Sequence, residues 1–532
     1  MKPLSEITSE DLLEIRLASA NFNNELINEL FEKSEDGTIP EEIYAIFEVG
    51  RTNFLLYQLL KYHLIVATGT PVLENIFYKN KRKLKEIVFS NARRYRYYLS
   101  NNIFSHNIQP KKFKYGFFIF DKRVMPAINS FVEYLSVKNK SAVFSSNIDV
   151  NADSTQSNFL WDSLYCNSTA KKYRKKIRTT NRQWFDKVTQ KTIKQAIVSV
   201  LDKLSLPYDS KDLLGLYNSW FNKVSPVIIR SLLISKELLT LFEFEKIVTS
   251  DVNDMKVRAA CYEAKKKGVE TFMLQQYING VEAVEYYNII QDKIICFGSY
   301  DLKLFPQFGI NEDRIKVGGT LKQWSDGTGM SSSRQDYLRN LKLKQKNYIV
   351  FISGPPNGGF YGDVDSLLTQ SGHRFILDEF ISVAEEMPDV GFVIKCHPEE
   401  YSSNNFLSLV EGQDNVYIVK ETYIDALLEY SSAVVTLFSS LGMEALHIKK
   451  PMLIADYSGI QQKVFDYHKS PLCELLTEKG ELLCKIKKVL SGEILNPKHV
   501  DSTSYIDEHF GGYAANSTLN NIYEKYESFL KG

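Results

Sequence analysis

Residues that could bind a phosphate group occur in two segments of the second half of the chain. The segment GFVIKCHPEE predicts a buried strand that ends at Lys395 and His397, and VVTLFSSLGMEAL predicts another that ends before Ser439 and Ser440. Open parallel sheets bind their ligands at the carboxyl ends of their strands. The two segments therefore predict one site for a nucleotide monophosphate or diphosphate that carries a sugar.

A short helix is predicted to follow the second segment, and Gly442 and Glu444 open it. Free backbone N–H groups at a helix start suit a phosphate, and the hydroxyl groups of Ser439 and Ser440 can share the anion. The structural alternative is an ordinary N-cap, since serine is a preferred cap residue. The two interpretations are compatible, because a cap exposed to a cleft is also an anion site.

His397 is followed by Pro398, which ends the predicted strand. A charged imidazole would stabilise a departing nucleotide, and Lys395 places a second cation nearby. A lone histidine at a strand end is more often structural. The functional hypothesis therefore depends on the neighbouring lysine and on the two serines.

A loop rich in glycine and proline, SGPPNGGFYGD, follows another predicted strand. Such a backbone can approach a ligand closely. Ser353, Gly354 and Asn357 are predicted to face the same site. A plain surface loop is the alternative.

Length and composition limit the class of protein. A chain of 532 residues predicts two or more domains, because one core rarely grows so large. A formal net charge of +1 gives no general attraction to nucleic acid or to an anionic membrane. Six cysteines without CxxC spacing favour reduced thiols in the cytoplasm. The chain shows neither a signal-peptide pattern nor an apolar run of about 18 residues.

Runs of apolar residues between helical patterns predict two parallel sheets. We expect a Ser cap in SEDLLEIRLAS, helices over 9–66, mainly helix over 155–245, and one terminal helix after 503. The expected strands are 115–121, 141–147, 246–251, 269–276, 293–299 and 314–320 in the first sheet and 347–353, 390–396, 415–419, 433–437 and 451–455 in the second.

This order of elements predicts five parts. They are a helical region at 1–111, a Rossmann-like domain at 112–325, a linker at 326–346, a second Rossmann-like domain at 347–502 and a terminal helix at 503–532. The resemblance given next implies that the first Rossmann-like domain binds the acceptor and the second binds the donor.

The motifs resemble those of GT-B glycosyltransferases of bacterial capsule and surface-carbohydrate assembly. These include CDP-glycerol glycerophosphotransferases, capsule Kdo transferases and polysialyltransferases. GFVIKCHPEE resembles their K/R-x-HP strand end, and LFSSLGMEALHIKKPMLI is similar to their S-S/T-x-G-x-E-A-L segment. The resemblance covers roughly 245–460, from KIVTSDVND onward. It departs at Gln275, Gln276 and Tyr277, where many relatives have Q-H-G.

The resemblance implies an α/β fold of the GT-B type, in which two doubly wound domains face a cleft and a helical extension precedes them. It implies a cytoplasmic enzyme, which could lie at the inner face of the cell membrane and which moves a sugar or polyol from a nucleotide-activated donor to a glycan or a lipid-linked glycan. Glu444 would bind the donor ribose, and a surface glutamate is the alternative. We expect neither cofactor, nor metal, nor nucleic acid. A non-hydrolysing nucleotide-sugar epimerase and a degenerate binding subunit are the rival hypotheses.

Glycosyl transfer benefits from a general base near the acceptor. Asp251, after the strand KIVTS, is the first candidate for the base and Asp254 the second. Either could instead cap a helix that begins near Val252. Gln275 and Tyr277 are predicted to line the acceptor side.

Two basic runs, KNKRKLKE at 79–86 and KKYRKKIR at 171–178, could face a membrane that carries a lipid-linked acceptor. Solvated helix faces are the alternative, and we favour it from sequence.

Overall fold

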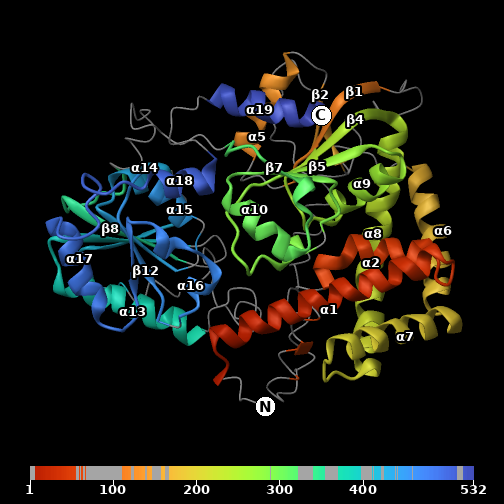
Figure 1. Ribbon diagram of the computed structural model, residues 1–532, viewed down its shortest axis with the longest axis horizontal. Coiled ribbons are helices and arrows are strands. Elements are labelled where there is room, and N and C mark those ends of the chain that lie inside the picture. Colours follow the sequence, from red (N-terminus) through yellow and green to blue (C-terminus); the bar gives the residue numbers. More distant parts are fainter. Residues whose placement is uncertain are drawn as a thin grey trace.

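The computed structural model describes residues 6–54, 59, 62–63, 66, 111–120, 125–137, 141–145, 157–161, 167–287, 289–321, 340–353, 370–396, 410, 412–420, 424–437, 439, 441–457, 459–511 and 519–532. The molecule contains two separate β-sheets, and helices lie around each of them (Figure 1).

The first sheet has seven parallel strands in the order β3-β2-β1-β4-β5-β6-β7. The strand order reverses between β1 and β4, which makes this pair the switch point of a doubly wound sheet. The strands are β1 (Lys111–Phe118), β2 (Ser141–Ser145), β3 (Ser157–Leu160), β4 (Phe242–Thr249), β5 (Glu270–Leu274), β6 (Lys293–Cys296) and β7 (Ile315–Val317).

The second sheet has six parallel strands in the order β10-β9-β8-β11-β12-β13. Its switch point lies between β8 and β11. Its strands are β8 (Asn347–Ile352), β9 (Val390–Lys395), β10 (Val416–Val419), β11 (Ala433–Thr436), β12 (Met452–Ala455) and β13 (Cys473–Leu476). Every residue of β9 is buried, as expected for a strand with helices on both faces.

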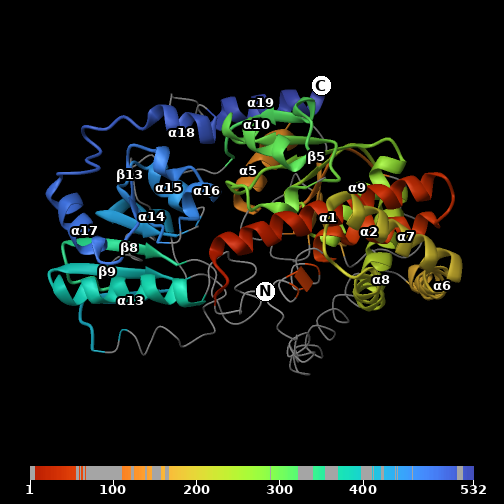
Figure 2. The same cartoon turned by 60° about the horizontal axis from the view of Figure 1, so that its bottom comes forward.

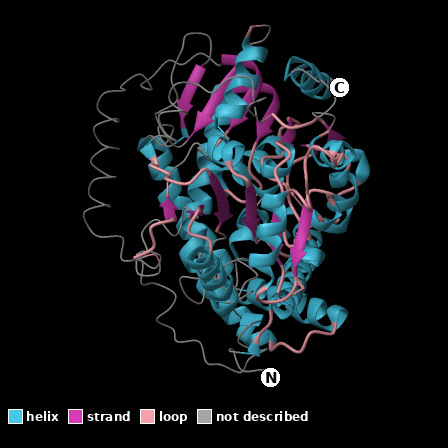
Figure 3. Cartoon of the chain, turned by 90° about the vertical axis from the view of Figure 1, so that its left-hand side faces the viewer, coloured by secondary structure: helices cyan, strands magenta, loops and turns pink. Residues whose placement is uncertain are grey.

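Helices separate the strands and cover the sheets, as Figure 3 shows by colour. Around the first sheet they are α5 (Met125–Ser136), α6 (Asn167–Trp184), α7 (Lys187–Leu204), α8 (Ser210–Leu241), α9 (Met255–Lys266) and α10 (Tyr300–Leu304). Around the second they are α13 (Gln370–Glu386), α14 (Ile424–Tyr430), α15 (Leu441–His447), α16 (Gln461–Val464) and α17 (Glu481–Ser491).

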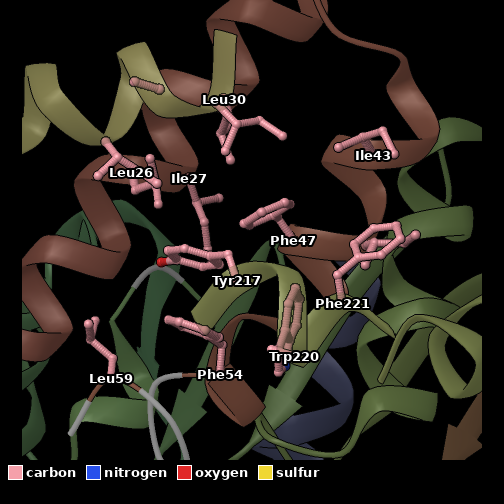
Figure 4. Packing of buried hydrophobic residues seen from close by; sticks show 14 of the residues in the cluster. Leu26, Ile27, Leu30, Ile43, Phe47, Phe54, Leu59, Tyr217, Trp220 and Phe221 are labelled. Carbon is pink, nitrogen blue, oxygen red and sulfur yellow. The ribbon is translucent and has the colours of Figure 1, made fainter. Parts of the chain in front are cut away.

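The N-terminal helices α1 (Ser9–Glu35) and α2 (Glu41–Phe54) share one apolar core with α7 and α8. Within it, Phe54 stacks on Tyr217 with ring centroids 3.9 Å apart, and Trp220 meets Phe54 edge-on at 5.4 Å (Figure 4). The cap of α1 is Thr8 rather than the predicted serine, because its side chain accepts from Asp11 N–H while the Asp11 side chain bonds back to the Thr8 backbone.

A buried arginine ties α2 to the first sheet. The Arg258 side chain on α9 is fully buried, and its Nη2 lies 3.1 Å from Glu48 Oε1 and 2.8 Å from the Glu48 carbonyl oxygen. Arg51 Nη2 lies 2.6 Å from the other carboxylate oxygen. Burial lowers the pKa of Arg258 to about 10, which leaves it charged at neutral pH.

The end of the chain returns from the second sheet to the first. The structure has two helices where one was predicted, α18 (Thr503–Phe510) and α19 (Leu519–Lys531). Helix α19 packs on α5 and on the first sheet, and Tyr526 donates to the Gly319 carbonyl at 2.6 Å. Figure 2 shows α18 and α19 along one side of the molecule.

The predicted fold class, two doubly wound α/β domains with an N-terminal helical extension, is confirmed. The prediction missed the outermost strands β3 and β13, and the segment 155–245, predicted as mainly helix, contains β3. Both are short edge strands, and β13 is only partly buried along most of its length, so it lacks the apolar run that reveals an inner strand.

Candidate functional site

Three strand ends meet in register at the carboxyl edge of the second sheet. Ile352, the last residue of β8, pairs with Lys395 at the end of β9 on one side and with Thr436 at the end of β11 on the other. Ser353 follows Ile352 and donates its backbone N–H to the Lys395 carbonyl at 3.0 Å. The predicted residues Ser353 and Lys395 are therefore neighbours at the switch point.

The polar groups at this edge are withdrawn from solvent. Ser353 is 2% exposed and Lys395 is 8% exposed. The Thr436 hydroxyl is buried and has no hydrogen-bond partner among the residues that the structure describes. A charged amine and an unsatisfied hydroxyl near a switch point are what an anionic ligand would use.

Ser439 lies two residues before α15 begins at Leu441. Its Oγ accepts from the Leu441 N–H at 3.3 Å, and its carbonyl accepts from the Gly442 N–H at 2.9 Å and from the Tyr467 hydroxyl at 2.8 Å. These bonds hold the start of α15, which lies at the same sheet edge.

Gly442 lies where α15 packs closely against the second sheet. A Cβ atom there would lie 3.0 Å from Met452 Sδ and 3.3 Å from Thr436 Cγ2, so the glycine allows this packing. Glu444 lies in the first turn of α15 and is partly exposed. His397, Ser440, Gly354 and Asn357 lie outside the described residues.

The two predicted carboxylates of the first sheet lie directly after β4. Asp251 Oδ1 accepts from the backbone N–H groups of Asn253 at 2.5 Å and Asp254 at 2.9 Å. Asp254 is the N-cap of α9, which begins at Met255 rather than near Val252, and its Oδ1 accepts from the Lys256 N–H at 2.7 Å. Asp251 is partly exposed and lies beside the switch point between β1 and β4.

Gln275 is 1% exposed and bridges the ends of β5 and β6. Its Oε1 accepts from the Phe297 N–H at 2.7 Å, and its Nε2 donates to the Tyr277 carbonyl at 2.9 Å and to Asp301 Oδ1 at 3.1 Å. Burial raises the pKa of Asp301 to about 6. Gln275 therefore holds the ends of β5 and β6 together from the interior, whereas Tyr277 is 37% exposed.

The sequence did not predict a buried carboxyl group that lies where the two halves of the chain meet, that is, where the half that contains the first sheet meets the half that contains the second sheet. The Glu282 carbonyl accepts from Arg16 Nη2 at 3.2 Å, and the neighbouring Val281 N–H donates to the Val464 carbonyl at 3.3 Å. Glu282 as a residue is partly exposed, but its Oε2 is buried without a hydrogen-bond partner among the described residues. Burial raises the pKa of Glu282 to about 7, and the Arg16 charge opposes that rise.

A second contact between the halves that sequence reasoning missed is centred on His509 of α18. Its imidazole contacts Asp466, which follows α16, at 2.9 Å and stacks on Tyr300 of α10 with ring centroids 4.6 Å apart. No local pattern points to either contact, because the partners come from distant segments.

The described residues contain no group of three or more His, Cys, Asp or Glu side chains that could hold a metal ion. None of their helices combines the length and apolarity needed to span a membrane.

Residues 362–457 match the model of the family described as capsule polysaccharide biosynthesis protein. The matched segment includes β9, β11, α15 and β12, and so most of the edge described above. The match confirms the predicted resemblance to proteins of capsule and surface-carbohydrate biosynthesis in this segment. A search of the curated proteins found no match.

Solved structures that resemble the chain include the UDP-GlcNAc 2-epimerase of Methanocaldococcus jannaschii in complex with UDP-GlcNAc and UDP. Its identity is 11%, its TM-score is 0.47, and the alignment covers 79% of this chain and 100% of that one. The wall teichoic acid polymerase TagF has 13% identity, a TM-score of 0.42 and coverage of 87% and 99%. Anabaena HepE in complex with UDP-glucose has 10% identity, a TM-score of 0.43 and coverage of 78% and 99%.

Proposed function

We propose that this protein is a glycosyltransferase that moves a sugar, or a related phosphorylated polyol, from a nucleotide-activated donor to a growing surface polysaccharide such as capsule or O-antigen. One observation carries the proposal. The segment that matches the capsule polysaccharide family supplies Lys395 and Thr436, whose strands end in register at the switch point of the second sheet.

The donor would bind at that edge. Lys395 and His397 would face the phosphates, because cations there stabilise the charge that develops on a leaving nucleotide. Ser439, Ser440 and Gly442 would bring the start of α15 to the same phosphates. Ser353, Gly354 and Asn357 would line the site from the end of β8, and Glu444 would contact the ribose.

The acceptor, a glycan or lipid-linked glycan, would bind at the carboxyl edge of the first sheet. Asp251 is the better candidate for a general base, since it is partly exposed beside a switch point. Support for Asp254 is weaker, because its carboxylate caps α9. Tyr277 is 37% exposed and would contact the acceptor. Gln275 would not contact the acceptor but would position the strand ends that line this edge.

We further propose that transfer needs no metal or other cofactor. Basic side chains and a helix start can stabilise a leaving phosphate in place of a metal. The enzyme would work in the cytoplasm, at the inner face of the cell membrane. Chelator-treated protein that keeps full activity would support this part of the proposal, and activity restored only by added Mg²⁺ or Mn²⁺ would refute it.

The test begins with thermal unfolding of the protein in the presence of CMP, CDP, UDP, GDP and dTDP. A ligand that binds only the folded state raises its melting temperature, by an amount that corresponds to about 2.7 kcal/mol at a hundredfold excess over Kd. A rise with one nucleotide that is lost in Lys395→Met identifies the donor site. The matched control is Lys346→Met, because Lys346 is an exposed lysine before the opposite end of β8.

The nucleotide sugar selected in this way then separates the rival functions. A transferase releases nucleotide faster when the acceptor glycan is present. An epimerase converts the nucleotide sugar without any acceptor, and a binding subunit does neither. Conversion without acceptor, or the absence of any nucleotide effect, would overturn the proposed function.

A further inference from the structure

The helical corner formed by α6, Phe185, Asp186 and α7 carries exposed charge and exposed apolar side chains together. It lies at the end of the molecule that is far from the second sheet (Figure 1). Helix α6 contains four lysines, three arginines and no acidic residue. Only part of this charge is neutralised by the ion pairs that Lys172 makes with Glu237 at 3.4 Å and Lys176 with Glu42 at 2.5 Å.

Three basic residues of α6 face away from the protein. Tyr173, Ile177 and Trp184 pack into the N-terminal core, and their spacing of four and seven residues defines one face of the helix. Lys175, Arg178 and Arg182 follow with spacings of three and four residues on the opposite face, and all three are exposed.

Helix α7 repeats this division. Ile193, Ala196, Ile197 and Val200 are buried, whereas Lys187, Lys191 and Lys194 are exposed on the other face. Val198 is 38% exposed on that same outer face. Each helix therefore shows a basic stripe opposite the stripe that packs into the core.

The turn between the helices adds apolar side chains at the point where the stripes meet. Trp184 is buried and stacks on Phe221 at 4.1 Å, but the next residue, Phe185, is 52% exposed, and Val188 is 63% exposed. The turn is held in place because Asp186 Oδ2 accepts from the Val188 N–H at 2.9 Å and Gln190 Nε2 donates to the Trp184 carbonyl at 2.8 Å.

We propose that this corner is a docking surface for the anionic surface of a lipid bilayer. Lysine and arginine are drawn to anionic headgroups, and an aromatic and an aliphatic side chain held outward can enter the boundary between headgroups and acyl chains. The inference rests on the proposed function, which places the enzyme at the inner face of the cell membrane, and it names the surface that would contact this membrane. Its test measures binding alone and needs no glycosyl transfer.

The observations favour a bilayer over other partners. A second copy of the same corner would bring like charges together, which opposes association. Single-stranded nucleic acid would use several exposed aromatic rings as a stacking platform, but of the described aromatic side chains of this corner Phe185 alone is exposed, since Trp184 is buried and Tyr173 packs into the core. Phe185 and Val188 would have no role against a purely polar acidic glycan.

The experiment measures co-sedimentation of the full-length protein with vesicles of phosphatidylcholine alone and with vesicles that also contain phosphatidylglycerol. We expect binding only to the anionic vesicles, and weaker binding as salt is raised. The triple variant Lys175→Glu, Arg178→Glu and Arg182→Glu should bind on the order of 100-fold more weakly, because each basic residue contributes about 1 kcal/mol.

Matched variants distinguish the effect of lost basic charge from the effect of lost apolar insertion and from misfolding. Lys346→Glu, Lys487→Glu and Lys498→Glu make the same change at exposed lysines of the second half and should leave binding unchanged. Phe185→Ser with Val188→Ser should weaken binding about tenfold or more. Tyr430→Ser, at a side chain that is 53% exposed, is the control for this pair.

The remaining outcomes overturn the proposal. They are failure of the wild-type protein to bind anionic vesicles, equal binding by the α6 triple variant, and binding to a soluble acidic polysaccharide in place of vesicles. Thermal unfolding of the same samples with nucleotides reports the donor site separately, so a failed donor assignment and a failed docking surface are distinguishable.

Discussion

The imidazole Nε2 of His509 lies 2.9 Å from Asp466 Oδ1, and this contact fastens α18 to the second half of the chain. The other ring nitrogen, Nδ1, lies 2.8 Å from the Tyr505 carbonyl oxygen. Both partners are hydrogen-bond acceptors, and the two contacts use both ring nitrogens. The Asp466–His509 pair also lies next to Tyr300 of α10, whose ring stacks on the imidazole.

Asp466→Asn should destabilise the protein at neutral pH. Burial by itself would raise the pKa of Asp466, but the hydrogen bond and charge of His509 hold that pKa below its ordinary value. A lowered carboxyl pKa contributes stability above the ordinary value of about 3.9, and the contribution is lost as the pH falls through the folded-state pKa. We expect the free energy of unfolding to fall by about 1–3 kcal/mol at pH 7.

Urea unfolding of the wild type and the variant from neutral to acidic pH measures this difference. The gap should narrow below about pH 4. Asp313→Asn, at an exposed acid of the first half, is the control. A gap of constant size down to the lowest pH would show that the pair is not charged.

Gly298→Ala should disturb the docking of α18 onto the first sheet. A Cβ atom at Gly298 would lie 2.0 Å from the Glu508 carbonyl oxygen and 2.5 Å from the His509 carbonyl carbon, and both are backbone atoms. Overpacking against backbone costs about 1–3 kcal/mol or more. Gly215→Ala in α8 is the control, because nothing lies within 4 Å of its Cβ position.

Thermal unfolding should show a lower melting temperature for Gly298→Ala and an equal or higher one for Gly215→Ala, since alanine favours helix over glycine by about 1 kcal/mol. If both substitutions left the melting temperature unchanged, the close backbone contact at Gly298 would not exist in solution.

Glu282→Gln should stabilise the protein at alkaline pH. The pKa of Glu282 is raised to about 7 by burial, so the folded state keeps a proton that the unfolded state releases above its ordinary pKa of about 4.3. The wild type therefore loses stability between the two values as the pH rises, by at most about 4 kcal/mol. Glutamine stays neutral and avoids this loss.

The measurement is the melting temperature of both proteins at pH 4.5 and pH 8, values chosen on either side of the pKa of about 7. The advantage of Glu282→Gln should be present at pH 8 and small at pH 4.5. Glu285→Gln is a neighbouring comparison, because burial raises the pKa of Glu285 as well. A variant less stable than the wild type at pH 8 would mean that Glu282 is ionised and paired with Arg16.

The inner strands were predictable because a parallel strand with helices on both faces is a continuous apolar run. Val390 to Ile394 is such a run, and the expected strand 390–396 differs from β9 by one residue. Because the end of each apolar run marks the end of a strand, the positions of Lys395 and Ser353 at the strand ends could be predicted as well. In contrast, β13 is half-buried along most of its length, and CELL offers no comparable pattern.

Contacts between distant residues were not predictable in the same way. Arg16 and Glu282 are 266 residues apart, and His509 and Asp466 are 43 apart, so no local spacing links them. Asp254 and Ser439 show a different limit. Their residue types fit both a helix start and a ligand site, and in the structure Asp254 caps α9 while Ser439 bonds to the first residue of α15. Gln275 was expected to line a site, but its amide points into the interior.

His397→Ala and Ser440→Ala should each reduce turnover by about 10²-fold, provided that these groups stabilise charge on the leaving phosphate. Both residues belong to the segment that matches the capsule polysaccharide family, next to strand ends that lie in register with Ile352. Because the charge develops mainly in the transition state, kcat should fall more than nucleotide affinity does.

The controls use the same chemistry at other positions. Ser432→Ala removes a hydroxyl at the opposite end of β11, and His499→Ala removes an exposed imidazole far along the chain. Steady-state transfer assays with the identified donor should give wild-type kcat for both controls. Wild-type kcat in both His397→Ala and Ser440→Ala would remove these two residues from the donor site. Lys395 and Thr436, which are buried on either side of Ile352, would then be the candidates left for binding the phosphate.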